Sequence, residues 1–158
     1  MRTLRLVSFA FVCALALAPA AARGQGVVHH VSVGGHDQDP VGHTDANFSL
    51  VANQFSDGSV TGEYTDQFGQ GQGGFHAQID CLSVQGNEAW VSGFITSGTF
   101  GAVDLTGLPV ITRVQDNGKS ANGPPDAISF SFIGNPALCT TRPNLPLVPM
   151  TDGQVTVR

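Results

Sequence analysis

Short runs in which apolar and polar residues alternate are the dominant pattern of this chain past residue 22. The clearest of them are residues 48–52, 60–64, 110–114, 128–132 and 155–157. A period of two places alternate side chains on opposite faces of a β-strand. Glycine and proline are abundant, and charges are too sparse for the i,i+4 pairs of a surface helix. The pattern therefore predicts an all-β protein.

Turn-forming dipeptides separate these runs of alternation. They are Asp57-Gly58, Gly86-Asn87, Asn117-Gly118 and Asp152-Gly153. Glycine, asparagine and aspartate tolerate the positive φ angles that tight hairpins need. With a first strand near residues 27–33, the pattern predicts about eight antiparallel strands. That spacing is typical of a β-sandwich or a small up-and-down barrel, and the sequence does not choose between the two.

The stretch FHAQIDCLSVQGNEAWVSGFI, residues 75–95, predicts a central hairpin. A two-residue loop at Gly86-Asn87 places Ile79 opposite Phe94 if the register is strict. Strict alternation then predicts a core face made of Phe75, Ala77, Ile79, Cys81, Trp90 and Phe94. The opposite face begins polar and turns apolar toward the hairpin tip: His76, Gln78 and Asp80, then Leu82, Val84, Ala89 and Val91. We therefore expect another segment to cover that tip.

Residues 1–22 have the composition of an export signal. Two arginines precede the apolar run 6–17, and three alanines at 20–22 supply the small residues of a cleavage site. Cleavage after Ala22 is the leading prediction, and cleavage after Ala20 is the alternative. The apolar run is too short for the roughly 30 Å of a bilayer core. We therefore expect a secreted or periplasmic protein without a membrane span.

The proline-rich stretch 134–149 is the expected cover, because its prolines exclude it from the inner strands of a sheet. It contains Cys139, and Cys81 is its partner once Cys13 has been removed with the signal. In an exported chain, two remaining cysteines predict a disulfide. Such a bond would constrain the unfolded chain by about 4 kcal/mol. Zinc is the weaker alternative, since neither cysteine has a second ligand at zinc-site spacing.

Past the signal, the chain divides into a polar lead-in at residues 23–45, with a candidate first strand, and a single all-β domain at 46–158. The formal net charge of the full chain is −5, and Lys119 is its single lysine. No basic stripe is present that could follow a phosphate backbone. The composition argues against a nucleic-acid partner and is compatible with a cell-envelope or extracellular ligand.

The lead-in is rich in metal-ligating residue types. These are His29, His30, His36, Asp37, Asp39, His43 and Asp45. Imidazoles with carboxylates suit zinc or copper, and oxygen ligands alone suit calcium. However, His29 and His30 are adjacent on the predicted strand and point to opposite faces, so they cannot join one site. We favour a polar lead-in that binds no metal.

A second set of oxygen ligands lies in the loop DNGKSANGPPD, residues 116–126. The candidates for calcium are Asp116, Asn117, Asn122 and Asp126. Their spacing is not that of an EF-hand loop. A hairpin turn followed by a proline-stiffened loop explains the same residues without a metal, so calcium is retained only as an alternative.

No catalytic constellation emerges from the carboxylates in or near the predicted strands, which are Glu63, Asp66, Asp80 and Glu88. Glycoside hydrolysis needs two facing carboxylates, and nothing in the sequence pairs them. His76 and Asp80 lie four residues apart on one strand, roughly 13 Å, which is too far for direct contact. The sequence therefore favours a non-enzymatic binding or structural module of the cell envelope.

Two other functions stay open as alternatives. One is a small hydrolase or ligand-carrying β-barrel with a polar pocket near Glu63, His76 and Asp80. The other is a calcium-stabilised adhesion-like module. These three polar side chains are the binding candidates, and no residue is assigned a catalytic role.

Three stretches carry a resemblance: residues 75–95, then RVQDNGKSANGPPDAISF, then DGQVTVR. In order and spacing they resemble a group of small exported bacterial proteins of uncharacterised function. In that group a Cys-Leu-x-Val strand meets a Gly-Asn turn, and a Val-x-Asp-Asn-Gly hairpin precedes an Asp-x-Ile-Ser-Phe strand. The resemblance covers residues 46–158 and implies a secreted all-β domain. It assigns no catalytic residue and does not include the histidine-rich lead-in.

Overall fold

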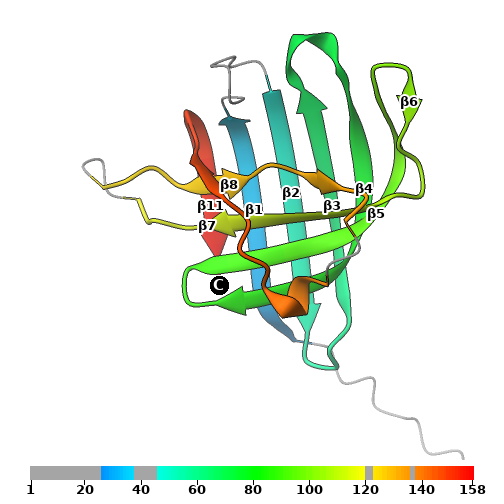
Figure 1. Ribbon diagram of the computed structural model, residues 1–158. Helices are drawn as coiled ribbons and strands as arrows, with labels where there is room; N and C mark the ends of the chain where they lie inside the picture. Colours follow the sequence, from blue (N-terminus) through cyan, green and yellow to red (C-terminus); the bar gives the residue numbers. More distant parts are fainter. Residues whose placement is uncertain (1–25, 38–45, 120–122, 136–137) are drawn as a thin grey trace, which may run out of the picture.

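A computed structural model of the chain describes residues 26–37, 46–119, 123–135 and 138–158. Within these ranges eleven strands form one antiparallel sheet that curls into a half-barrel (Figure 1). Two 3-10 turns are the only helical structure described, and no described helix has the length and apolar character needed to cross a membrane. The predicted all-β fold is confirmed.

The strands run in chain order as β1 (Val27–Asp37), β2 (Ala46–Phe55), β3 (Val60–Phe68), β4 (Gly73–Gln85), β5 (Glu88–Phe100), β6 (Val103–Asp104), β7 (Pro109–Gln115), β8 (Ala127–Ser129), β9 (Phe132–Ile133), β10 (Leu147–Pro149) and β11 (Asp152–Val157). The 3-10 turns are η1 (Gly69–Gly71) and η2 (Cys139–Thr141). The spatial order is β10-β8-β7-β5-β4-β3-β2-β1-β11, with β6 beside β5 and β9 beside β7. The short strands β6, β8, β9 and β10 hold two or three residues each. The alternating run 128–132 is divided between β8 and β9, which both pair with β7.

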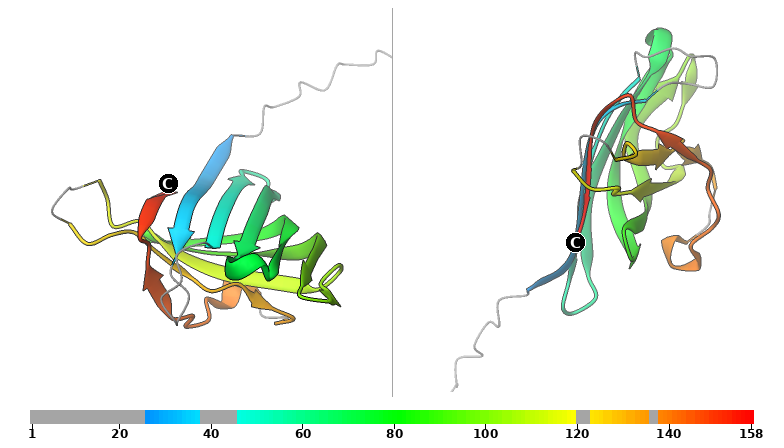
Figure 2. Two further views of the ribbon diagram at one scale, coloured as in Figure 1. Left: turned by 90° about the horizontal axis from the view of Figure 1, so that it is seen from above. Right: turned by 90° about the vertical axis from the view of Figure 1, so that its left-hand side faces the viewer.

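The half-barrel has two layers that share the long strands β4 and β5 (Figures 1 and 2). In the back layer, β3 pairs with residues 73–79 of β4. In the front layer, β7 pairs with residues 88–94 of β5 and crosses the back strands. Strands that bend from one sheet into the other make the corners of such crossed packings.

A β-bulge at Asp80 makes this corner. From the hairpin loop as far as the pair Cys81–Ser92, the observed register is the strict one predicted from the sequence. Beyond that pair the register shifts by one residue, and Ile79 lies opposite Gly93 instead of Phe94. The predicted pairing of Ile79 with Phe94 was therefore wrong.

The bulge exchanges the two faces of β4, whereas Ala89, Val91 and Ile95 of β5 all stay in the core. Ile79 and Leu82 both point into the core, whereas Cys81 and Trp90 lie on the outer face of the front layer. Phe94, which alternation placed in the core, is 53% exposed. The predicted core face is thus wrong at Cys81, Trp90 and Phe94. The one-residue slip also explains why the opposite face turns apolar toward the tip: the core side changes at the bulge.

The hydrophobic core fills the space between the two layers. It is built from alternate residues of nearly every long strand, among them Val31, Val33, Leu50, Ala52, Tyr64, Ile79, Val91, Val110, Val114, Ile128 and Val155. The first strand, expected near residues 27–33, is present and continues to Asp37. The lead-in thus contributes two buried valines, Val31 and Val33, to the core.

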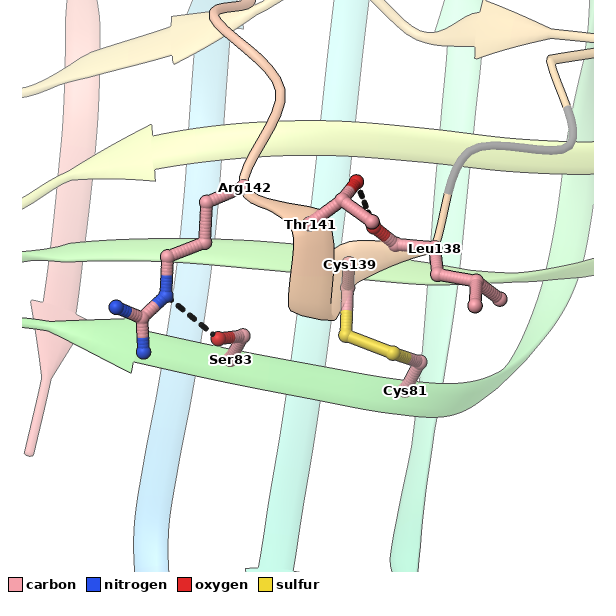
Figure 3. The surroundings of a disulfide bond; sticks show 6 residues. All are labelled: Cys81, Ser83, Leu138, Cys139, Thr141 and Arg142. Atoms are coloured by element: carbon pink, nitrogen blue, oxygen red, sulfur yellow. Dashed lines mark hydrogen bonds between the residues drawn. A yellow bond between two sulfur atoms is a disulfide. The ribbon is translucent and has the colours of Figure 1, made fainter.

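Residues 138–145 form a strap over the outer face of the front layer. The predicted disulfide is confirmed: Cys81 and Cys139 are bonded, with their Cα atoms 5.9 Å apart (Figure 3). Next to this bond, Arg142 Nε donates to Ser83 Oγ at 2.9 Å (Figure 3). The predicted cover therefore exists, but it lies on the face that carries Cys81 and not on the Leu82 face.

The strap also rests on an aromatic and cationic pair of the front layer. Trp90 Nε1 donates to the carbonyl oxygen of Pro143 at 2.8 Å. The guanidinium of Arg113 lies 5.1 Å from the centre of the Trp90 ring, donates to both Glu88 carboxylate oxygens and reaches the carbonyl oxygen of Leu145 at 3.1 Å. These bonds give the otherwise irregular backbone of the strap its partners.

Candidate functional site

A row of four side chains crosses the outer face of the back layer, the face turned away from β7 and β8. Val51 on β2 pairs with Glu63 on β3, Glu63 pairs with Gln78 on β4, and Gln78 pairs with Phe94 on β5. Directly paired residues of antiparallel strands point to the same face, so the four side chains form a continuous line. Val51 and Phe94 at its two ends are 41% and 53% exposed.

Alternation explains why these side chains point outward. Their neighbours along the strands, Leu50, Tyr64, Ala77 and Ile79, are buried in the core. Because successive residues of a strand point to opposite faces, the polar residues between them must face solvent. The outward set is dominated by serine, threonine, asparagine and glutamine.

A depression of about 390 Å³ lies over this part of the sheet. Two smaller depressions, of about 170 Å³ and 200 Å³, adjoin it and share Thr65 and His76. We refer to the joined surface of the depressions of about 390 Å³ and 170 Å³ as the polar groove. Its outward side chains are Ser49, Val51, Asn53, Thr61, Glu63, Thr65, His76, Gln78 and Thr96.

Hydrogen bonds hold several groove side chains in place. Thr65 Oγ1 lies 2.9 Å from His76 Nδ1, and Gln78 Nε2 donates to the Gly62 carbonyl oxygen at 2.7 Å. Glu63 lies between these two bonded pairs on the sheet, and its carboxylate has no hydrogen-bond or ion-pair partner among the described residues. The groove thus presents one unused carboxylate among uncharged polar groups.

The structure brings together two of the three binding candidates inferred from the sequence. Glu63 and His76 line the same depression of about 170 Å³. Asp80 occupies the bulge at the corner and does not line the groove. All three side chains are exposed. The ligand-carrying interior of the alternative hypothesis is instead occupied by the apolar core.

Asp66 lies on β3 but faces the opposite side from Glu63. Ser131 Oγ donates to Asp66 Oδ2 at 2.5 Å, and Tyr64 Oη lies 2.7 Å from Ser131 Oγ. This contact joins the back layer to the segment that precedes β9. Asp66 therefore serves packing between the layers and cannot face Glu63 across the groove.

Two of the calcium candidates bind backbone N–H groups of the edge strand β11. Asp126 accepts from Val155 N at 2.6 Å and from Asn117 N at 2.7 Å. Asp116 accepts from Val157 N at 3.0 Å. Residues 155 and 157 direct these N–H groups away from β1, to the side on which no strand of the described ranges pairs with β11. Asp116 and Asp126 thus accept the hydrogen bonds that the carbonyl groups of a neighbouring strand would otherwise accept.

The remaining metal candidates do not assemble into a site in the described ranges. Asn117 Nδ2 donates to the Pro125 carbonyl oxygen at 2.7 Å, and Asn122 lies outside the described residues. In the lead-in, His30 Nδ1 lies 2.8 Å from Asn53 Oδ1, while the Asp37 side chain and Asp39, His43 and Asp45 lie outside the description. Among described residues, no group of three or more His, Cys, Asp or Glu side chains could hold a metal ion.

Sequence reasoning missed the apolar ends of the groove row, Val51 and Phe94. The available signal was a change of phase around Asp80. Apolar residues occupy odd positions before it, at 75, 77 and 79, and even positions after it, at 82 and 84. Such a slip in a period-two pattern indicates a bulge, and a glycine at position 93 on the facing strand supports it.

Comparison of the chain with protein-family models, with curated proteins and with solved structures finds no match.

Proposed function

We propose that this protein is an exported, non-enzymatic β-domain that binds a cell-envelope or extracellular ligand in the polar groove. The signal-like sequence that supports export, residues 1–22, lies outside the described residues. The disulfide between Cys81 and Cys139 supports the same location, because such bonds persist in oxidising compartments. The absence of a basic stripe argues against nucleic acid as the ligand.

The observation that carries this proposal is the row from Val51 to Phe94. Binding sites combine exposed apolar surface with a few polar groups that fix the orientation of the ligand. In this row two exposed apolar side chains enclose Glu63 and Gln78. The Glu63 carboxylate has no partner within the described part of the protein, so it is available to a ligand.

A hydrolase at the same place is less well supported. Acid–base hydrolysis of a glycoside uses two carboxylates on either side of the scissile bond. Glu63 is the single carboxylate in the polar groove as defined, and Asp66 on the same strand points into the half-barrel. The geometry therefore favours binding over catalysis.

Co-sedimentation with envelope fragments of the source organism tests the proposal. We expect the purified protein to sediment with these fragments, and the double variant Glu63→Ala/Gln78→Ala to lose most of that binding. The matched control is Gln85→Ala, which removes an exposed glutamine at the hairpin tip outside the groove. Equal sedimentation of the groove variant and the control would place the binding surface elsewhere and refute the proposal.

A further inference from the structure

The charge of the polar groove limits the class of ligand that it can bind. No lysine or arginine lines it, and its one carboxylate, Glu63, is unpaired among the described residues. His76 is the one other titratable side chain of the groove, and its Nδ1 is bonded to Thr65. An anionic ligand would meet a like charge without a compensating cation. The groove thus suits a ligand without negative charge.

Hydrogen-bonding capacity limits the ligand further. Gln78 Nε2 donates a hydrogen bond to the Gly62 carbonyl oxygen. This bond orients the Gln78 side chain so that Oε1 is available as an acceptor. Glu63 beside it accepts only. The hydroxyl groups of Ser49, Thr61 and Thr65 both donate and accept. A ligand that fills the groove must bring donors to the centre of the row and mixed donor–acceptor groups around it, which is the pattern of sugar hydroxyls.

The apolar ends of the row supply the third requirement. Val51 and Phe94 are separated by three strand intervals, roughly 14 Å at about 4.8 Å per strand. This distance exceeds one pyranose ring, so a ligand that contacts both ends must be an oligomer. Sugar rings carry apolar C–H faces between their hydroxyls, and an exposed aromatic ring such as Phe94 packs against such faces.

We propose that the polar groove binds an uncharged oligosaccharide. Phe94 stacks on one sugar ring, and Glu63 and Gln78 accept hydrogen bonds from the hydroxyl groups of the oligosaccharide. This inference rests on the proposed function and names the chemical class of its ligand. Charge-assisted hydrogen bonds from sugar hydroxyls to Glu63 give the strongest polar contact in the row.

The test is a titration of isotope-labelled protein, followed by NMR, with cellotetraose and with N-acetylated chitotetraose. At least one of the two should shift the backbone amides of β2, β3 and β4 around the groove. Phe94→Ala should weaken that binding roughly tenfold. Phe100→Ala is the matched control, because Phe100 is also 53% exposed but lies at the far end of β5. This variant should bind the oligosaccharide with the affinity of the wild type.

Charged probes decide between ligand classes. Tetragalacturonate and tetralysine should leave the groove amides unshifted, and Glu63→Gln should weaken oligosaccharide binding less than Glu63→Ala does. Tetralysine binding that disappears in Glu63→Gln would overturn the inference in favour of a cationic ligand. The inference would also be overturned if neither uncharged oligosaccharide shifted the groove amides at millimolar concentration.

The two proposals can fail separately. If envelope fragments bind the wild type but not the groove variant, while neither uncharged oligosaccharide shifts the groove, the site stands and the ligand class is wrong. If the groove variant sediments like the wild type, the site itself is wrong.

Discussion

Asp116 and Asp126 show how single side chains complete an edge of this sheet. The free edge of β11 carries N–H groups that would otherwise have no protein partner, and exposed edges are templates for aggregation. Asp126 binds Val155 N and Asp116 binds Val157 N. The two aspartates that resembled calcium ligands in the sequence thus bind the backbone of β11.

Asp126→Asn should lower the free energy of unfolding by about 2 kcal/mol, because two hydrogen bonds to a charged acceptor are weakened and one acceptor oxygen is lost. Urea unfolding followed by the fluorescence of Trp90 measures the change. Asp152→Asn, at an exposed aspartate near the start of β11, is the control and should be close to neutral. A chelator should leave the melting temperature of the wild type unchanged; a fall would support the calcium alternative.

Among the described residues, Asp104 has a pKa that departs clearly from its ordinary value. The Thr106 side chain donates to its carboxylate, the Thr106 backbone N–H donates to Oδ1 at 2.9 Å, and together they lower the pKa of Asp104 below its ordinary value. The stabilising effect is therefore present above the pKa of the unfolded chain and is lost as the pH falls through the lower, folded pKa. In an NMR titration, Thr106→Val should raise the Asp104 midpoint; an unchanged midpoint would contradict this cause.

At the scale of elements, the bend of β4 and β5 is the feature on which the two layers depend. A bulge inserts one residue, bends the strand and strengthens its twist. On the facing strand, a Cβ at Gly93 would lie 2.0 Å from the Gln78 carbonyl oxygen. The close approach of the two backbones at this corner leaves no room for a side chain.

Gly93→Ala should therefore destabilise the fold by about 1–3 kcal/mol or more, since the rigid backbone of β4 must move to admit the methyl group. Gly34→Ala on β1 is the matched control, because no atom lies within 4 Å of its added Cβ. Denaturant midpoints of the two variants provide the comparison. Equal midpoints would show that the backbones of β4 and β5 can move apart at this corner without loss of stability.

The strap is an element whose position depends on covalent chemistry. The disulfide links residues 58 positions apart. The double variant Cys81→Ser/Cys139→Ser should lose about 4 kcal/mol of stability by the loop-entropy argument. Arg142→Ala, which removes the bond to Ser83 but keeps the disulfide, should lose far less. Mass spectrometry of alkylated, unreduced protein should find no free thiol on either cysteine.

At the scale of the whole molecule, the two layers cannot fold independently. They share β4 and β5, and one continuous hydrophobic core lies between them. The chain offers a reporter in each layer: its single tyrosine, Tyr64, is on β3 in the back layer, and its single tryptophan, Trp90, is on β5 in the front layer.

Unfolding should therefore be a single cooperative transition. Trp90 fluorescence and ¹⁹F NMR of fluorotyrosine at position 64 should give the same denaturant midpoint, as two-state behaviour requires. Far-ultraviolet circular dichroism should follow the same curve. Two separate midpoints would show that the back layer is stable without the front one.

Much of this architecture was predictable because it depends on neighbours in sequence. Alternation located the long strands and Gly86-Asn87 located the hairpin, but the turn predicted at Asp152-Gly153 was wrong, because both residues lie in β11 and pair with β1. The disulfide was predicted from the count of cysteines together with the expected removal of Cys13. The hydrogen bonds of Asp116 and Asp126 to backbone N–H groups of β11 could not be foreseen from the sequence. Those partners come from the other end of the sheet, and no local pattern records that contact.

Period-two patterning and turn chemistry by themselves determined that this protein is all β and that the chain turns at Asp57-Gly58 and Gly86-Asn87, because these properties need only local propensity. The tertiary structure alone decided which side of the central hairpin faces the core, and hence that Phe94 is exposed beside Glu63 and Gln78. The physical reason is that a one-residue bulge at Asp80 reverses the phase of β4, so that Ile79 and Leu82 both face the core while Gln78 and Cys81 face outward.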